Sequence, residues 1–340
     1  MLSDSRGMHT DHDVSPADSR SALVPEAGDD FVLSPEVVAL TERALAYLEA
    51  GYPVHFSGPA GTGKTTMAFH VAAQLGRPVS LVHGSDEFSA SDLVGRDSGY
   101  RKSSMVDNYI SSVLKTEETM QVNWVDNRLT TACERGHTLI YDEFNRSRAE
   151  ANNTLLSILE EGILNVPRSD GSGYIVVHPE FRLILTSNPV EYAGVHETQD
   201  ALLDRLVTVE VGHYDRDTEV AITASKSGIP EHDAARLVDV ARSLRARDPG
   251  GHVPTVRATI TLAQVLARRD VPVDAADERF LAFAWDVFGR AIRRTSPDRT
   301  DLGRHVVAEL MGPDRRGSRG GSGRGGTRTT GRNASKEAIR

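Results

Sequence analysis

The chain has 340 residues, of which 39% are apolar and 26% charged, and these shares predict a globular protein with one large or two modest domains. Its single cysteine, Cys133, excludes an intramolecular disulfide, so we expect a reducing, cytoplasmic compartment. No apolar run approaches the roughly 18 residues of a membrane span, and the first residues lack the apolar core of a signal peptide. We therefore expect no membrane partner.

The two ends of the chain differ in composition from the rest. Residues 1–30 carry seven acidic residues against two arginines, which predicts a disordered segment. Residues 313–340 form a Gly/Ser/Arg-rich tail with seven arginines and one lysine against two acidic residues, and are also predicted to be disordered. Charge alone could dock this tail on RNA or on an acidic protein surface, or it could stay solvated. The remainder is acidic, which argues against a surface that coats nucleic acid.

Between these ends, the apolar pattern predicts an α/β core followed by helices. Ser34, Pro35 and Glu36 supply a hydroxyl cap, a first-turn proline and an acidic residue at the positive end of the helix dipole, so a helix should begin here. From about residue 218 to 310 the pattern is helical throughout, which predicts a smaller helical domain. The region before it alternates helical stretches with short apolar segments, as is typical of a parallel sheet covered on both faces. Strands are expected at 54–56, 79–82, 138–141, 181–185 and 207–211.

The sequence GPAGTGKT lies between the first predicted strand and a helical run, with the spacing of a phosphate-binding loop. Its glycines let the backbone curl so that successive N–H groups face phosphate oxygens, and the following helix adds its positive dipole end. Lys64 is expected to reach the β- and γ-phosphates, and the Thr65 hydroxyl to ligate Mg²⁺. The predicted ATP-binding residues of this loop are Gly58, Pro59, Ala60, Gly61, Thr62, Gly63, Lys64, Thr65 and Thr66.

Asp142 and Glu143 directly follow the apolar strand predicted at 138–141. In a protein with a phosphate loop, the first acidic residue at such a strand end holds Mg²⁺ through water, and an adjacent glutamate can act as general base on the attacking water. The pair therefore indicates ATP hydrolysis. A GTPase is disfavoured because Asp92 to Gly95 matches the short DxxG pattern but no Asn-Lys-x-Asp sequence is present. The twelve histidines contain no His-Glu-x-x-His arrangement, which argues against a metal hydrolase.

Together these motifs resemble the AAA+ ATPases, and in particular their MoxR-like branch, over about residues 30–310. The resemblance implies a P-loop α/β domain at 31–213 and a helical lid domain at 214–312. It implies that Asn188, in the sequence LILTSNP, contacts the γ-phosphate or orients the water. It also implies that Arg257, in the sequence VPTVRA, contacts phosphate from the lid.

The same resemblance implies an arginine that acts on the nucleotide of a neighbouring subunit. Arg205, in the sequence ALLDR, resembles the residue that has this role in the family, and Arg128, Arg146 and Arg148 stay open as alternatives. The physical case is that a transition state gaining negative charge is stabilised by an added cation. We accordingly expect a ring oligomer, with six subunits by family resemblance.

Residues 151–178 resemble the insert in helix 2 of this branch, which often faces a ring pore: a helix should end at Gly162, with a hairpin through Gly171 and Gly173. Longer stretches, such as TSNPVEYAGVHETQDALLDR, resemble the MoxR-like ATPases encoded with gas vesicle genes. That resemblance implies a remodelling factor for gas vesicle assembly, with ATP and Mg²⁺ as cofactors, vesicle structural or accessory proteins as partners, and a place in the cytoplasm or on the vesicles. A chaperone ATPase for another complex, a non-catalytic ATP-gated scaffold and a nucleic-acid motor stay open.

Overall fold

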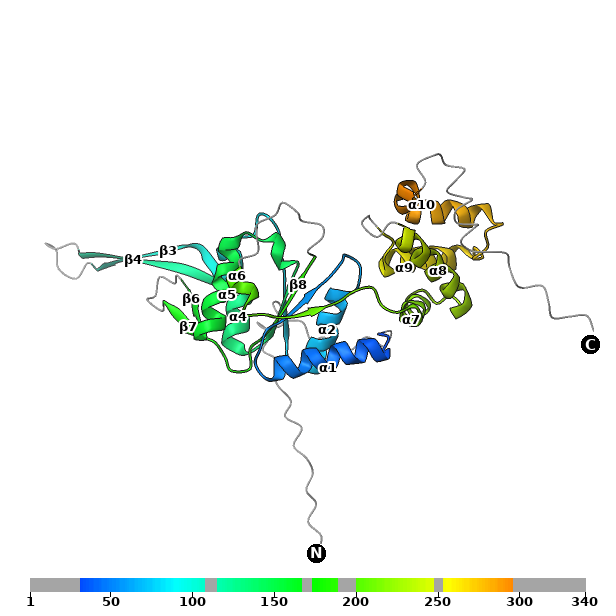
Figure 1. The fold of residues 1–340 in the computed structure, drawn as a ribbon. Coiled ribbons are helices and arrows are strands. Elements are labelled where there is room, and N and C mark those ends of the chain that lie inside the picture. Colours follow the sequence, from blue (N-terminus) through cyan, green and yellow to red (C-terminus); the bar gives the residue numbers. More distant parts are fainter. Residues whose placement is uncertain (1–30, 108–114, 167–172, 189–199, 248–252, 296–340) are drawn as a thin grey trace, which may run out of the picture.

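The central sheet of the protein has five parallel strands in the order β2-β5-β8-β1-β9 (Figure 1). The computed structural model describes residues 31–107, 115–166, 173–188, 200–247 and 253–295. The strand bounds are β1 Val54–Ser57, β2 Val79–His83, β5 Thr138–Asp142, β8 Arg182–Ser187 and β9 Val207–Glu210. All five strands predicted from apolar segments are confirmed, and the α/β class with them. The predicted disordered segments at 1–30 and 313–340 lie outside the described residues and stay predictions.

One face of the sheet is covered by α1 (Pro35–Glu49) and α2 (Lys64–Gln74). The α1 helix begins as predicted, because the Ser34 hydroxyl accepts a hydrogen bond from the Val37 N–H at 3.3 Å and a proline follows it. A cluster of fully buried apolar side chains fills the space between these helices and the sheet. Its members include Leu48, Val54, Phe56, Met67, Val71, Ile140 and Ile184.

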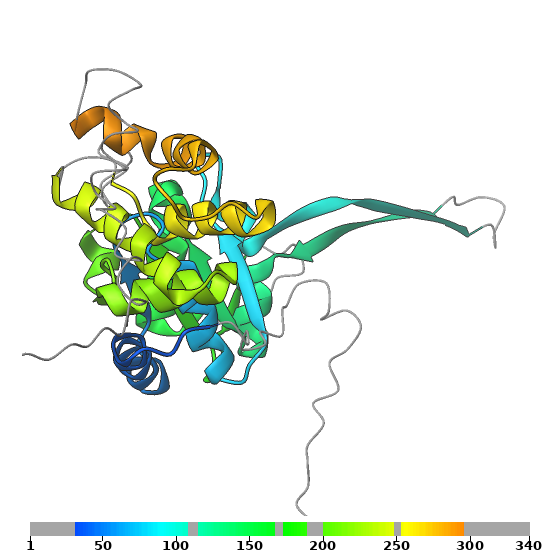
Figure 2. The same cartoon turned by 90° about the vertical axis from the view of Figure 1, so that its right-hand side faces the viewer.

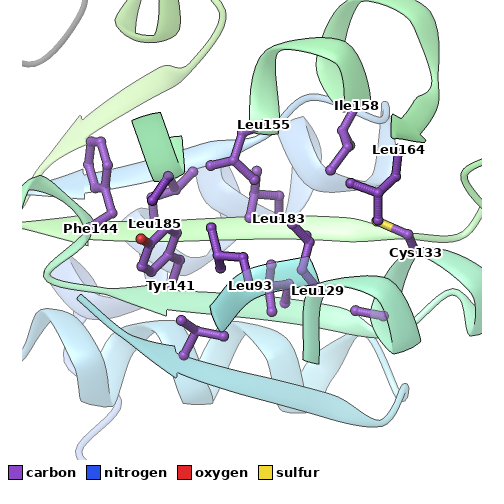
Figure 3. Close-up of a cluster of buried hydrophobic side chains, with 14 of the residues drawn as sticks. Leu93, Leu129, Cys133, Tyr141, Phe144, Leu155, Ile158, Leu164, Leu183 and Leu185 are labelled. Atoms are coloured by element: carbon purple, nitrogen blue, oxygen red, sulfur yellow. The ribbon is translucent and has the colours of Figure 1, made fainter. Parts of the chain in front are cut away.

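The other face is covered by α4 (Arg128–Arg135) and α5 (Ala149–Glu161), with the short helices α3 (Ala90–Val94) and α6 (Asp200–Leu203) beside them. Figure 3 shows the apolar cluster between these helices and the sheet. Both faces are thus buried, which explains why the strands have near-continuous apolar sequences rather than alternating ones. The labelled side chains are Leu93, Leu129, Cys133, Tyr141, Phe144, Leu155, Ile158, Leu164, Leu183 and Leu185.

Where the sequence predicts a helical region, the described residues after β9 form four helices: α7 (Arg216–Ser227), α8 (Glu231–Arg247), α9 (Val256–Arg269) and α10 (Glu278–Thr295). They have an apolar core of their own, which includes Leu237, Leu262 and Phe280. They also touch the α/β part, because Val256 belongs to the cluster on the α1 side and Glu36 accepts a hydrogen bond from the Asp215 N–H at 3.1 Å. The boundary expected at 213/214 falls between β9 and α7, and it stays a proposal as a domain limit.

Two antiparallel hairpins leave the body of the α/β part. The expected one is present after α5 as β6 (Ile163–Asn165) and β7 (Tyr174–Val176), with residues 167–172 outside the described part of the chain. The other was not expected: β3 (Gly95–Asp107) and β4 (Lys115–Asp126) form a long ribbon between α3 and α4. Figures 1 and 2 show this ribbon projecting far from the sheet, on the side away from α7–α10. The larger insertion therefore lies between β2 and β5.

Across the described ranges, the helices all fall short of the length and apolarity that a bilayer span requires.

Candidate active site

The phosphate loop connects the end of β1 to the start of α2. Gly58 has no room for a side chain, because an added Cβ would lie 2.1 Å from the carbonyl oxygen of Val211. Gly63 caps α2 in the left-handed region at φ 88°, where glycine is favoured. The Lys64 Nζ donates hydrogen bonds to the carbonyls of Gly58 at 2.9 Å and Pro59 at 2.7 Å, so the ammonium group lies inside the curled loop.

Asp142 ends β5 beside the start of α2. Its Oδ1 accepts hydrogen bonds from the Thr65 hydroxyl at 2.7 Å and from the Thr186 hydroxyl at 2.5 Å, and His83 Nδ1 lies 3.4 Å from Oδ2. The two residues expected to hold Mg²⁺ thus meet across 77 positions of the chain. No group of three or more His, Cys, Asp or Glu side chains that could hold a metal occurs in the parts of the chain described above. One carboxylate and one hydroxyl suit Mg²⁺ that arrives with phosphate and water ligands.

Glu143 adopts a left-handed backbone conformation at φ 52°, which is uncommon for a residue with a side chain and is typical of functional sites. Its N–H donates a hydrogen bond to the Thr186 hydroxyl at 3.0 Å, so one threonine holds both acidic residues. The Glu143 side chain is 44% exposed and its Oε2 accepts a hydrogen bond from Arg146 Nη1 at 2.7 Å. Arg146 therefore occupies the carboxylate that is predicted to act as base.

Asn188 directly follows β8, which lies between β5 and β1 in the sheet. Ser57 and Ser187 pair in register, so Asn188 lies at the same strand edge as the start of the phosphate loop. The Asn188 side chain is 3% exposed, and its carbonyl oxygen has no hydrogen-bond partner among the described residues. Buried polar atoms in proteins are nearly always paired, so this oxygen is available to a water or a ligand.

A cavity of about 300 Å³ lies beside the loop and is lined by residues of the loop and of the helices α7 and α9. Its lining is mostly apolar, as is usual for the part of a ligand site that receives a flat ring. Tyr214 is part of this lining, and burial together with the charge of Glu36 raises the pKa of its phenol to about 12, so the phenol is neutral. Arg257, on the first turn of α9, also lines the cavity. The principal lining residues are Phe31, Val37, Gly61, Gly63, Met67, Tyr214, Val256, Arg257 and Ile260.

The four arginines that are candidates for acting on a neighbouring subunit's nucleotide (the trans role) make contacts in different parts of the structure. Arg205, in the turn that follows α6, forms an ion pair with Glu160 of α5. Arg128 and Arg148 donate hydrogen bonds to backbone carbonyls near the end of β2 and just beyond it, at Leu81 and Asp86. Arg146, by contrast, is the one of the four that contacts Glu143.

Sequence reasoning missed two residues of this site, Thr186 and His55. Thr186 holds Asp142 and the Glu143 backbone, and its signal was its place directly after the strand predicted at 181–185, two residues before Asn188. His55 is a buried histidine on the strand that leads into the phosphate loop. A polar residue within a fully buried strand was the available signal for it.

Comparison with known proteins agrees with this geometry. The model of the AAA domain (dynein-related subfamily) matches residues 53–206. The gas vesicle ATPase GvpN of Ancylobacter aquaticus is 50% identical over 267 residues, covering 78% of this chain and 75% of that protein. The GvpN of Haloferax mediterranei is 45% identical over 240 residues, covering 70% and 68%. Protein NorQ of Paracoccus denitrificans is 31% identical over 246 residues, covering 71% and 82%. The chain belongs to the GvpN family of gas vesicle ATPases, within the AAA proteins.

Proposed function

We propose that this chain binds ATP with Mg²⁺, hydrolyses it, and uses the reaction to remodel proteins during gas vesicle assembly. The observation that carries the enzymatic part is the hydrogen-bonded group of Thr65, Asp142 and Thr186 beside the phosphate loop, with Glu143 next to it. A protein that only bound nucleotide would not need the adjacent glutamate.

ATP binding would use the loop and the cavity together. The backbone N–H groups of the loop and the start of α2 attract the phosphates, and Lys64 exchanges the carbonyls of Gly58 and Pro59 for phosphate oxygens. The apolar cavity between the loop and α9 has the lining expected for the base and ribose. Arg257, exposed at the edge of this cavity, supplies a positive charge from the lid side.

Hydrolysis would begin when Glu143 leaves Arg146 and accepts a hydrogen bond from a water molecule. The water oxygen forms a bond to the γ-phosphorus, the bond from that phosphorus to the β–γ bridging oxygen breaks, and ADP and phosphate are the products. Asn188 is assigned the orientation of this water or of the γ-phosphate. Thr65 and Asp142 would hold Mg²⁺, which would neutralise charge on the phosphates.

The cellular role follows from the relatives. Two proteins at 50% and 45% identity carry the name gas vesicle ATPase, so we assign this chain to gas vesicle assembly, with a place in the cytoplasm or on the vesicles. A ring, with six subunits as the family resemblance implies, is part of the proposal, with Arg205 completing the neighbouring site. The main alternative is a chaperone ATPase for another complex, which is favoured by the more distant similarity to NorQ and to the cobaltochelatase subunit CobS. Only the basic tail argues for a nucleic-acid motor.

The test has an enzymatic arm and a cellular arm. Phosphate release from ATP by the purified chain should require Mg²⁺ and should be lost in Lys64→Ala and Glu143→Gln. In cells that carry a gas vesicle gene set without this chain, the wild-type chain should restore full-sized vesicles and Glu143→Gln should not. Restoration by Glu143→Gln would mean that ATP binding alone suffices, as in a scaffold. Turnover without any effect on vesicles would favour a chaperone for another complex.

A further inference from the structure

His55 lies on β1, between β8 and the edge strand β9, three residues before the phosphate loop begins. Its side chain is buried, and each ring nitrogen faces a hydroxyl on a neighbouring strand. Nε2 is 2.8 Å from the Ser187 Oγ on β8, and Nδ1 is 3.1 Å from the Thr208 Oγ1 on β9. One side chain on β1 therefore makes hydrogen bonds to side chains on both neighbouring strands.

The residues that His55 touches are neighbours of the proposed catalytic residues. Ser187 directly precedes Asn188 in the chain. On the same face of the sheet, the ring of Phe144 meets the imidazole edge-on, with the ring centroids 5.2 Å apart and the planes at 89°. Phe144 directly follows Glu143. His55 thus contacts one residue next to Asn188 and one residue next to Glu143, without contacting either.

The imidazole is electrically neutral at physiological pH. Burial, with a smaller contribution from the positive charge of Lys64, lowers the pKa of His55 to about 4. A neutral imidazole donates a hydrogen bond from one nitrogen and accepts one at the other, and serine and threonine hydroxyls can take either role. The ring can therefore satisfy both hydroxyls at once. An apolar residue of similar size would leave the buried Ser187 hydroxyl without this partner, whereas the exposed Thr208 hydroxyl could turn to solvent.

We propose that His55 positions Asn188 for ATP hydrolysis through its hydrogen bond to Ser187. This inference rests on the proposed hydrolytic function and adds a residue to it. The carbonyl oxygen of the Asn188 side chain has no partner among the described residues, so the end of β8 sets where that side chain lies. Fixing the Ser187 side chain fixes the peptide that leads into Asn188. Small displacements of a group that orients the reactants lower the rate steeply.

A positioning role makes a different prediction from a purely structural one. His55 does not line the cavity or the loop, so its loss should lower kcat and leave the affinity for ATP unchanged. A residue that served stability alone would change the melting temperature, and kcat would not depend on which of its two hydrogen bonds was removed.

Two amide substitutions separate the two hydrogen bonds. In His55→Gln the side-chain amide reaches the position of Nε2 and keeps the bond to Ser187. In His55→Asn the shorter amide reaches the position of Nδ1 and keeps the bond to Thr208. We expect kcat to fall about tenfold in His55→Asn and less than about threefold in His55→Gln, with the Kd for ATP within about twofold of wild type in both. The measurements are steady-state phosphate release and equilibrium binding of a fluorescent ATP analogue, each with a thermal melt.

A second pair of substitutions tests the same bonds from their other ends. Ser187→Ala should lower kcat about as much as His55→Asn, and the double variant should lose little more, since both changes remove one interaction. Thr208→Val removes the other hydrogen bond while keeping the side-chain shape, and because the exposed Thr208 is not the link to Asn188, kcat should stay close to wild type. If the His55 variants do not fold, Ser187→Ala and Thr208→Val still test whether the hydrogen bond between His55 and Ser187 is needed for kcat.

Equal kcat values in His55→Asn and His55→Gln, or in Ser187→Ala and Thr208→Val, would overturn the positioning role of His55 while leaving the ATPase function intact. A loss confined to ATP affinity would overturn it as well. A wild-type chain that releases no phosphate from ATP would overturn the proposed function, and this inference with it.

Discussion

Asp142 and Glu143 are adjacent in the chain but differ in their surroundings. Asp142 is buried and accepts hydrogen bonds from two threonine hydroxyls, which hold its carboxylate in place. The Glu143 side chain is about half exposed and is bound to Arg146 through an ion pair that solvent weakens. A fixed carboxylate suits a metal ligand, whereas a carboxylate that can move suits a base that must first be released.

Glu143→Gln tests the role of the base at this scale. The substitution keeps the shape of the side chain and removes its negative charge, so ATP binding should persist while hydrolysis falls by about 100-fold or more. Phosphate release and binding of a fluorescent ATP analogue measure the two properties separately. Glu161→Gln, at an exposed glutamate of α5, is the matched control and should hydrolyse ATP at the wild-type rate. Near-normal turnover by Glu143→Gln would remove this residue from the mechanism.

His55 should also make the protein sensitive to acid. Its pKa lies at about 4 in the folded chain against 6.5 ordinarily, so between these values the unfolded chain binds a proton that the folded chain does not. The free energy of unfolding therefore falls as pH falls through this window. Between pH 7 and pH 5 this one residue should account for about 2 kcal/mol. Urea unfolding of wild type and His55→Gln should diverge by that amount. Parallel curves would contradict the burial of a neutral imidazole.

At the scale of elements, the phosphate loop is held between β9 and α9. Gly58 packs against the backbone of Val211 just past β9, and Gly61 packs against Thr255 at the cap of α9. Gly61 also has a φ of 72°, which a larger residue would adopt only with strain. The loop therefore has its shape because two other elements leave it no space to relax.

Gly58→Ala should disrupt this packing. An added Cβ would lie 2.1 Å from a backbone oxygen that cannot rotate away, so the loop or β9 must shift. We expect a loss of about 1–3 kcal/mol in the free energy of unfolding, together with greatly weakened ATP binding. Gly212→Ala is the control, because a Cβ at Gly212 would meet no atom within 4 Å and should be tolerated. If both alanine variants behaved alike, the close approach to Val211 would not govern the loop.

At the scale of the whole molecule, the candidate site lies between the α/β part and the helices after β9. In the proposed ring, Arg205 of a neighbouring subunit would complete it. The cavity is lined both by the α/β part and by α7 and α9, so the placement of the helical part decides its shape. Arg205 is far along the chain from the loop, lies in the turn that follows α6, and has a side chain that is about one-third exposed. An arginine in such a place can reach a second subunit if the ring proposed above forms.

Mixing two inactive variants tests that arrangement. Arg205→Ala keeps its own phosphate loop, and Lys64→Ala keeps its own arginine. In a mixed ring, some sites would combine an intact loop with a neighbour's Arg205, so the mixture should regain part of the wild-type rate of ATP hydrolysis. Light scattering before and after mixing checks that both variants assemble equally. A mixture no more active than its components would assign the trans role to another arginine, with Arg146 the next to test.

Much of the fold, and the phosphate loop of the site, could be predicted from local sequence patterns. The five strands follow from short apolar runs, the start of α1 from Ser34 and Pro35, and the phosphate loop from eight consecutive residues, because each depends on interactions between near neighbours in the chain. The β3–β4 ribbon escaped prediction for the same reason. Its sequence is mostly polar and alternates with apolar residues only over the short stretch Met120 to Trp124, so most of it lacks the periodic signal that a strand packed on a core would have.

The sequence alone thus determined the fold class, the phosphate loop and the acidic pair, since these are encoded in short contiguous motifs. Only the tertiary structure decided which side chains meet. Thr65 and Thr186 reach the same oxygen of Asp142 because α2 starts beside β5 and β8 pairs with β5. His55 finds its partners 132 and 153 positions away because β8 and β9 flank β1. Such contacts depend on strand order and register, which arise from burial of the whole sheet and which no local pattern encodes.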